Sequence, residues 1–159
     1  MKTAVWMSIA GLLGLVQPAM DLQQTGQLAR DRQLPVLLYV SRSDCTFCRR
    51  FEAEVLNPLL RSGAIAGKIV IRELVWDLPQ PVTDFAGREV SRASLAQAYQ
   101  AKLTPTLLFL DADGQEITAR ITGYPRSDYF SYYLEAAVAD AAAAIRAPVP
   151  HPADEADTR

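Results

Sequence analysis

The stretch PVLLYVSRSDCTFCRRF, residues 35–51, decides the fold. It opens with a continuous apolar run, Pro35 to Val40, which predicts a buried central strand. A loop rich in helix-capping residue types follows the strand. Apolar residues then recur at helical spacing, at Phe47, Phe51, Val55 and Leu59. Cys45 is therefore expected at a strand-to-helix turn, and Cys48 in the first turn of the helix.

These two residues are the only cysteines in the chain. A structural disulfide stabilises a protein most when it closes a long loop, because it then removes the most entropy from the unfolded chain. A pair separated by two residues removes little. We therefore expect the pair to serve a chemical function. The charged residues that follow on the same helix, Arg49, Arg50, Glu52 and Glu54, are expected on its solvated face.

Composition limits the possible classes of protein. The chain has 159 residues, half of them hydrophobic, with 16 basic and 18 acidic side chains. This length suits one domain with a proper core. The basic residues are scattered along the chain and do not form a stripe, so the sequence gives no support for a nucleic-acid partner.

The two ends of the chain differ from its middle. Lys2 precedes an uncharged, mostly apolar run from Ala4 to Val16, which is short for a membrane span and fits a secretory signal peptide. We expect residues 1–20 to be this signal peptide, with the cut near Ala19. The alternatives are a helix packed on the domain or an uncleaved membrane anchor. Residues 148–159 are acidic and Pro-rich, and a disordered tail is expected there.

Between these ends, residues 21–147 are expected to form a single domain. The patterns predict a surface helix at 21–33, a second strand at 68–77, an irregular insertion at 78–92 and a helix at 94–103. They also predict two strands around the Asp113-Gly114 turn and a long helix at 126–146. A strand–helix–strand unit followed by a helix and a hairpin implies a mixed sheet with helices on both faces.

This order of elements resembles the thioredoxin superfamily, and in particular the exported thioredoxin-like thiol–disulfide oxidoreductases of bacteria. The resemblance rests on Cys45-x-x-Cys48, on Thr104-Pro105 before the hairpin, and on the ITGY sequence at residues 121–124. It implies the α/β thioredoxin fold, a central mixed β-sheet flanked by helices. It further implies that Pro105 is cis and that Thr104 and Pro105 form a ledge for an extended substrate segment.

The chemistry of such a pair depends on the thiolate, which an ordinary cysteine supplies sparingly at neutral pH. A helix N-terminus favours the anion, so we expect Cys45 to ionise more easily, to be more exposed and to attack the substrate. Cys48 would resolve the mixed disulfide and leave a Cys45–Cys48 redox disulfide. Phe47 offers an apolar contact to the substrate, or else simply packs at the start of the helix.

Two positions depart from the cytoplasmic thioredoxins. Tyr39 stands where they carry a buried Asp that helps deprotonate the second cysteine. Asp44 stands where they carry a Trp. These differences affect the expected rate of thiol–disulfide exchange and the choice of partner. The resemblance still implies thiol–disulfide exchange itself.

The resemblance favours a monomeric periplasmic reductant of protein disulfides, re-reduced by a membrane-bound donor and needing no cofactor beyond its thiols. A disulfide oxidant or isomerase is the alternative direction, since the reduction potential decides it. From other classes, a metal-binding module or a redox-inert interaction module stays open. No metal is expected, because the sole histidine, His151, lies in the tail and no third ligand accompanies the cysteines.

Overall fold

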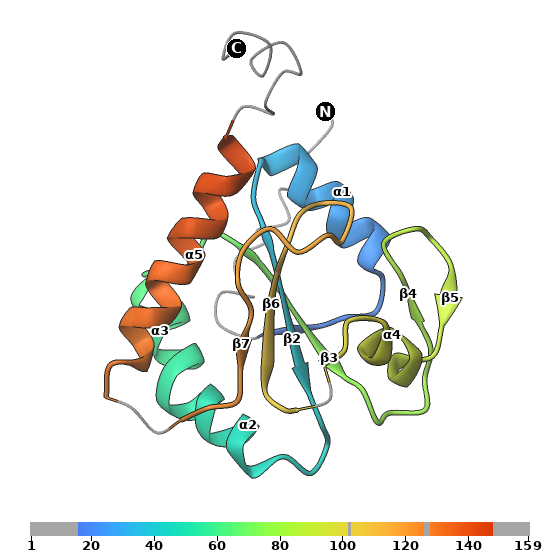
Figure 1. Ribbon diagram of the computed structural model, residues 1–159, viewed down its shortest axis with the longest axis horizontal. Helices are drawn as coiled ribbons and strands as arrows, with labels where there is room; N and C mark the ends of the chain where they lie inside the picture. The colour runs from blue at the N-terminus through green and yellow to red at the C-terminus, as the bar shows by residue number, and fades with distance from the viewer. Residues whose placement is uncertain (1–15, 102, 126–127, 148–159) are drawn as a thin grey trace, which may run out of the picture.

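A five-stranded mixed sheet forms the centre of the computed structural model, which describes residues 16–101, 103–125 and 128–147 (Figure 1). The strand order is β1-β3-β2-β6-β7. β3 pairs in parallel with both β1 and β2, whereas β6 is antiparallel to both β2 and β7. The strands are β1 (Gln17–Pro18), β2 (Val36–Ser41), β3 (Val70–Val75), β6 (Thr106–Leu110) and β7 (Ile121–Thr122).

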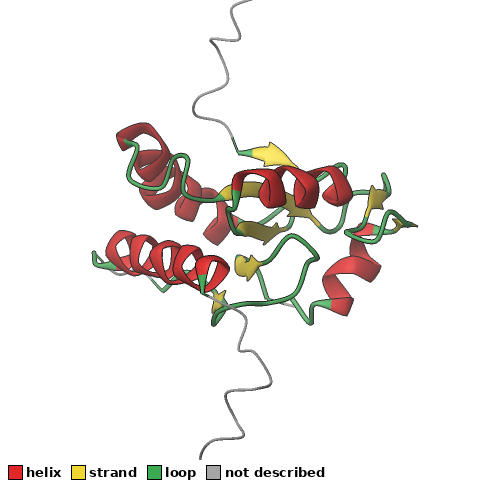
Figure 2. Cartoon of the chain, turned by 90° about the horizontal axis from the view of Figure 1, so that it is seen from above, coloured by secondary structure: helices red, strands yellow, loops and turns green. Residues whose placement is uncertain are grey.

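Helices cover both faces of this sheet, as the view from above shows (Figure 2). The helical segments are α1 (Leu22–Arg32), α2 (Thr46–Phe51), the π-helical η1 (Glu52–Leu56), α3 (Asn57–Ser62), α4 (Arg92–Ala98) and α5 (Phe130–Arg146). α2, η1 and α3 follow one another without a break. Within η1 the N–H of Asn57 donates to the carbonyl of Glu52, five residues earlier, which widens this turn of the helix.

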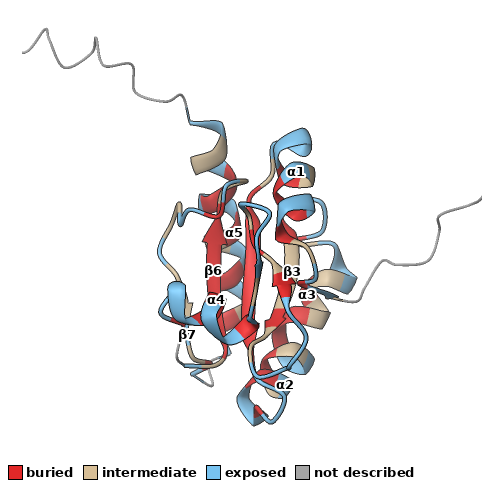
Figure 3. Cartoon of the chain, turned by 90° about the vertical axis from the view of Figure 1, so that its right-hand side faces the viewer, coloured by how far each residue is buried: buried red, intermediate tan, exposed pale blue. Residues whose placement is uncertain are grey.

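The central strand β2 separates two hydrophobic cores. All six of its residues are buried, as the continuous apolar run predicts (Figure 3). Because side chains alternate along a strand, Leu37 and Tyr39 enter one core and Leu38 enters the other. The first core lies under α2, α3 and α5 and contains both cysteines. The second lies under α1 and α4.

The irregular insertion contains a small second sheet. β4 (Val82–Thr83) pairs with β5 (Glu89–Val90) in an antiparallel hairpin. Asp84 organises the turn between them, because its carboxylate accepts the backbone N–H groups of Ala86 and Arg88 and pairs with the Arg88 guanidinium. These side-chain hydrogen bonds stabilise a hairpin that has only two paired positions between its strands.

The edge strand β1 was not predicted. Gln17 and Pro18 pair with β3, and Ala19 is fully buried with its N–H donating to the carbonyl of Glu73 at 2.8 Å. These residues belong to the region expected to be a signal peptide, most of which, residues 1–15, lies outside the described residues. The predicted tail at 148–159 lies outside them as well. Among the described helices, none is long and apolar enough to cross a bilayer.

Two sequence predictions near the C-terminus need correction. The strand after the Asp113-Gly114 turn begins only at Ile121, because a single bridge from Glu116 to Leu110 replaces the first part of the expected ladder. Helix α5 begins at Phe130, later than the predicted start near residue 126. Tyr129 and Tyr133 match the apolar spacing of this segment, which predicts burial, but they are 72% and 60% exposed. Phe130, Leu134 and Val138 form the buried face of the helix instead.

Candidate active site

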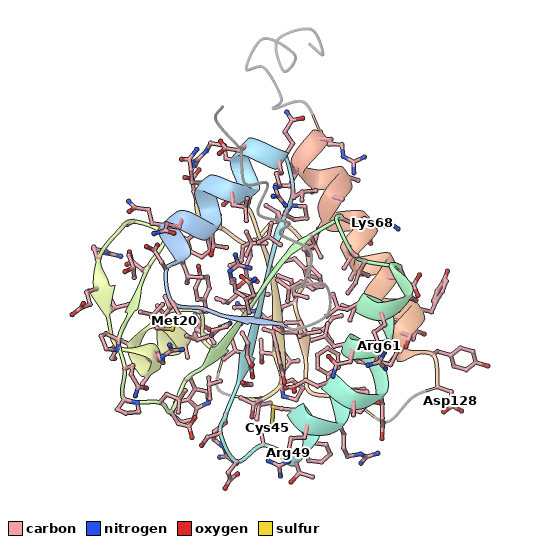
Figure 4. The ribbon with its side chains drawn as sticks, turned by 180° about the vertical axis from the view of Figure 1, so that it is seen from behind. Met20, Cys45, Arg49, Arg61, Lys68 and Asp128 are labelled. Atoms are coloured by element: carbon pink, nitrogen blue, oxygen red, sulfur yellow. A yellow bond between two sulfur atoms is a disulfide. The ribbon has the colours of Figure 1, made fainter. Side chains whose placement is uncertain are left out.

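The cysteine pair lies where β2 leads into α2, as the sequence predicts. Cys45 is the N-cap residue of α2, and Cys48 is in its first turn. The two form a disulfide with an S–S distance of 2.06 Å, and Figure 4 shows Cys45 with Arg49 nearby at one end of the molecule. Both are buried, Cys45 at 5% and Cys48 at 2% exposure. Cys45 is thus the more exposed of the two by a small margin.

The surroundings of the Cys45 sulfur favour negative charge. Its Sγ accepts the backbone N–H of Cys48 at 3.1 Å, so the sulfur occupies the position of a helix-capping oxygen. The first turn of α2 holds no acidic residue, and Arg49 is hydrogen-bonded back to Thr46 beside the pair. Asp44, the nearby negative charge, forms an ion pair with Arg42. Reduction of the disulfide would therefore leave Cys45 where a thiolate is stabilised.

The predicted substrate ledge lies at the same end of the sheet. The peptide bond between Thr104 and Pro105 is cis. Thr106 pairs with Val40, so the ledge stands beside the end of β2, from which the chain continues to Cys45. The carbonyl of Pro105 accepts the N–H of Gly123 at 2.7 Å, which ties the ledge to the end of β7.

The side chains of the ledge differ in exposure. Pro105 is buried and Thr104 is half-buried, whereas Phe47, between the two cysteines, is 57% exposed. The structure therefore presents Phe47 to solvent next to the disulfide. Packing at the start of the helix accounts for less than half of its surface.

Tyr39 has a hydrogen-bond partner that the sequence did not indicate. Its side chain is fully buried, and its hydroxyl donates to Glu52 Oε1 at 2.8 Å. Burial, together with the negative charges of Glu52 and Glu73, raises the pKa of Tyr39 above its ordinary value. The backbone N–H of Glu52 donates to the carbonyl of Cys48. Glu52 therefore lies one helical turn after the second cysteine.

Glu54 is exposed and Glu52 half-buried, so both lie toward the solvated face as expected, but each also accepts a hydrogen bond that the sequence did not predict. Tyr124 donates its hydroxyl to Glu54 Oε2 at 2.7 Å, so each glutamate receives a tyrosine from the core beneath it. Helical periodicity alone could not show this, because both tyrosines are distant in sequence. One signal was available, since a Tyr inside a buried strand requires a partner for its hydroxyl.

A second acid lies beside Tyr39 on the neighbouring strand. Glu73 is the register partner of Tyr39 and accepts the hydroxyl of Ser41 at 2.5 Å. Burial raises the pKa of Glu73, and the charge of Glu52 raises it further, while the Ser41 hydrogen bond opposes the shift. Tyr39, Glu52 and Glu73 thus form a cluster of interacting titratable groups at the base of the cysteine turn. Within the described ranges, no cluster of His, Cys, Asp or Glu is arranged to hold a metal.

Three features together define a thiol–disulfide oxidoreductase domain. They are a mixed sheet with helices on both faces, a Cys-x-x-Cys pair at a helix N-terminus, and an adjacent cis-proline. The chain belongs to the family described as "Thioredoxin-like domain", whose model matches residues 22–138. The fold class expected from the sequence is confirmed.

Curated relatives resemble the chain in sequence, and solved structures share its fold. The chain is 26% identical over 121 residues to the thiol:disulfide interchange protein DsbD of Yersinia pestis (strain Pestoides F), covering 75% of this chain and 19% of the relative. It therefore spans about a fifth of the length of the curated relatives it matches.

Among solved structures, DsbH oxidoreductase superposes with a TM-score of 0.59 at 16% identity, covering 87% of this chain and 95% of that one. A thioredoxin-fold protein from Helicobacter pylori superposes with a TM-score of 0.52 at 25% identity, covering 65% and 68%.

Proposed function

We propose that this domain exchanges disulfides with protein partners in the periplasm and acts there as a reductant. The observation that carries the proposal is the position of the Cys45 sulfur. It caps α2, accepts the N–H of Cys48, and lies at the end of the sheet that also holds Thr104 and Pro105. A nucleophilic thiolate and a surface for an extended substrate are thereby combined.

The reaction proceeds in two exchanges. In the reduced protein the Cys45 thiolate attacks one sulfur of a substrate disulfide, which expels the other substrate sulfur as a thiolate and forms a mixed disulfide. The Cys48 thiolate then attacks the Cys45 sulfur and releases the second substrate thiolate. Two electrons pass to the substrate, and the protein is left with the Cys45–Cys48 disulfide present in the structure.

Three residues would bind the substrate segment next to the reacting sulfurs. The half-buried Thr104 would offer backbone hydrogen bonds to an extended chain, and Pro105 would hold that backbone in place beside the disulfide. The exposed Phe47 would contact an apolar side chain of the substrate. Because these contacts involve mainly backbone and apolar surface, they suit protein substrates of varied sequence.

The direction of electron flow and the compartment rest on similarity. The DsbD relative is named a thiol:disulfide interchange protein, which supports exchange with a redox partner. The apolar run from Ala4 to Val16, as an export signal, would bring the domain to the periplasm, where a membrane-bound donor would reduce it again. Oxidant or isomerase activity is the alternative, and the reduction potential distinguishes the two directions.

The test compares Cys45→Ala with Cys48→Ala in a single-turnover reaction with insulin. We expect Cys48→Ala to accumulate a mixed disulfide and Cys45→Ala to form none. The reverse pattern would reassign the nucleophile, and a wild-type protein without activity would remove the function. A reduction potential below about −240 mV would support a reductant, since thioredoxin lies near −270 mV, whereas one above about −180 mV would indicate an oxidant or isomerase.

A further inference from the structure

The guanidinium of Arg49 lies beside the disulfide and forms no ion pair with any carboxylate in the part of the chain that the structure describes. The backbone N–H of Arg49 donates to the carbonyl of Cys45 at 3.1 Å, so the two residues are one helical turn apart. The side chain is exposed, and one of its guanidinium nitrogens donates to the Thr46 hydroxyl at 3.2 Å. This contact holds the cation at the start of α2, next to the sulfurs (Figure 4).

The other charged side chains of the cysteine turn already have partners. Two ion pairs flank the turn, Arg42 with Asp44 at 3.1 Å and Arg50 with Glu54 at 3.4 Å. Asp77, which follows β3, accepts both the N–H and the hydroxyl of Ser43. A guanidinium has five N–H donors, so Arg49 keeps most of its donors for a bound molecule.

Apolar side chains next to Arg49 would bring a partner close to it. Phe47 is 57% exposed, and Leu103, which directly precedes Thr104 of the ledge, is 67% exposed. Large apolar side chains exposed together at one end of a domain are typical of a protein–protein contact. A partner segment that packs on Phe47 and the ledge would place the residues beside its own disulfide within reach of Arg49.

We propose that Arg49 selects partners that carry a carboxylate next to their disulfide. The inference rests on the proposed function and names the class of segment that the site prefers. The planar guanidinium matches both oxygens of a carboxylate, so an Asp or Glu side chain of the partner accepts two parallel hydrogen bonds from Arg49. This preference adds to the backbone and apolar contacts of the ledge.

Electrostatics gives the preference a direct effect on the reaction. A thiolate at Cys45 repels a carboxylate beside the disulfide that it attacks. A cation one helical turn from that thiolate offsets the repulsion, so an acidic segment becomes a favoured substrate. The chain as a whole has a formal net charge of −2, so a preference for an acidic segment has to come from local charge.

The experiment measures how fast the reduced full chain reacts with three synthetic peptides, each containing one disulfide. The peptides share an apolar residue on one side of the disulfide and carry Glu, Gln or Lys on the other side. Acid quenching followed by thiol alkylation gives the rates. At low salt we expect the Glu peptide to react about two to five times faster than the Gln peptide, and the Lys peptide to react slowest. The differences should shrink at about 1 M salt, where the Debye length is about 3 Å.

Three variants assign the preference to one side chain. Arg49→Gln should bring the three rates together; its weaker stabilisation of the thiolate slows all three peptides alike, so the ratio between peptides is unaffected by it. Arg49→Lys keeps the charge without the planar fork and should retain part of the preference. Arg61→Gln is the matched control and should retain all of it. Arg61 is exposed and has no ion pair within the described ranges, but it lies on α3, about four helical turns after Cys45 (Figure 4).

The outcomes separate this inference from the function on which it rests. Equal rates of the wild type with the Glu and Lys peptides would overturn the inference and leave disulfide exchange in place. A preference that survives Arg49→Gln, or that Arg61→Gln abolishes, would overturn it as well, because other cations would then be responsible. If none of the three peptides is reduced, the proposed function fails, and the inference fails with it.

Discussion

Replacing Tyr39 by Phe tests the hydrogen bond beneath the cysteine turn. The substitution keeps the buried ring and its edge-to-face contact with Phe51, whose centroid is 5.4 Å away. It removes only the hydroxyl that donates to Glu52 Oε1 at 2.8 Å. Any loss of stability therefore reports on this one bond.

The expected loss follows from the acceptor. A hydrogen bond to a charged group contributes about 1.5–3 kcal/mol, and the lower end applies because Glu52 is only half-buried and water can partly replace the hydroxyl. A loss of about 1.5 kcal/mol should lower the Tm by about 3–6 °C for a domain of this size. The assay is urea and thermal unfolding of the oxidised protein at pH 7.

Two further variants make the result specific. Tyr99→Phe is the control, because Tyr99 donates to the uncharged carbonyl of Gly114 at the same 2.8 Å and should lose only about 1 kcal/mol. Glu52→Gln should cost less in the Y39F background than in the wild type. Equal costs in both backgrounds, or a Tyr39→Phe protein as stable as the wild type, would refute the coupling.

Three other predictions concern stability. Because burial raises the pKa of Glu73, the folded chain binds that proton more tightly, so stability should fall as pH rises from 4.5, and Glu73→Gln should flatten this decline in urea unfolding. Gly26→Ala should lose about 1–3 kcal/mol in thermal unfolding despite its better helix propensity, since the new Cβ would lie 2.2 Å from the Ala112 carbonyl oxygen. A chain beginning at Asp21 should unfold at a lower temperature than one beginning at Gln17, because it lacks β1; equal Tm values would contradict this.

Local patterns carried most of the sequence prediction. The apolar run at 35–40 predicted β2, and the spacing of Phe51 and Val55 predicted the helix after the cysteines, because burial imposes a period on each element. The turn position of Cys45 followed directly. These features depend on neighbours within a few residues.

Features that depend on distant residues were missed. β1 has two residues, one of them Pro18, and is a strand only because β3 offers an edge to it. Periodicity treats Tyr133 as apolar, yet the helix leaves 60% of it exposed, beside a groove whose other wall comes from Thr118 to Ile121. The partners of Glu52 and Glu54 likewise come from other elements.

The division of the interior by β2 has a consequence for how the domain can vary. Leu37 and Tyr39 face the core that holds the cysteines, whereas Val36, Leu38 and Val40 face the core under α1, α4 and the β4–β5 insertion. Changes in that second core can alter thermal tolerance or the surface offered by the insertion while leaving the sulfur chemistry unchanged. The redox centre and the insertion can therefore diverge separately, and an engineer could graft a new recognition loop at 84–88 without redesigning the cysteine turn.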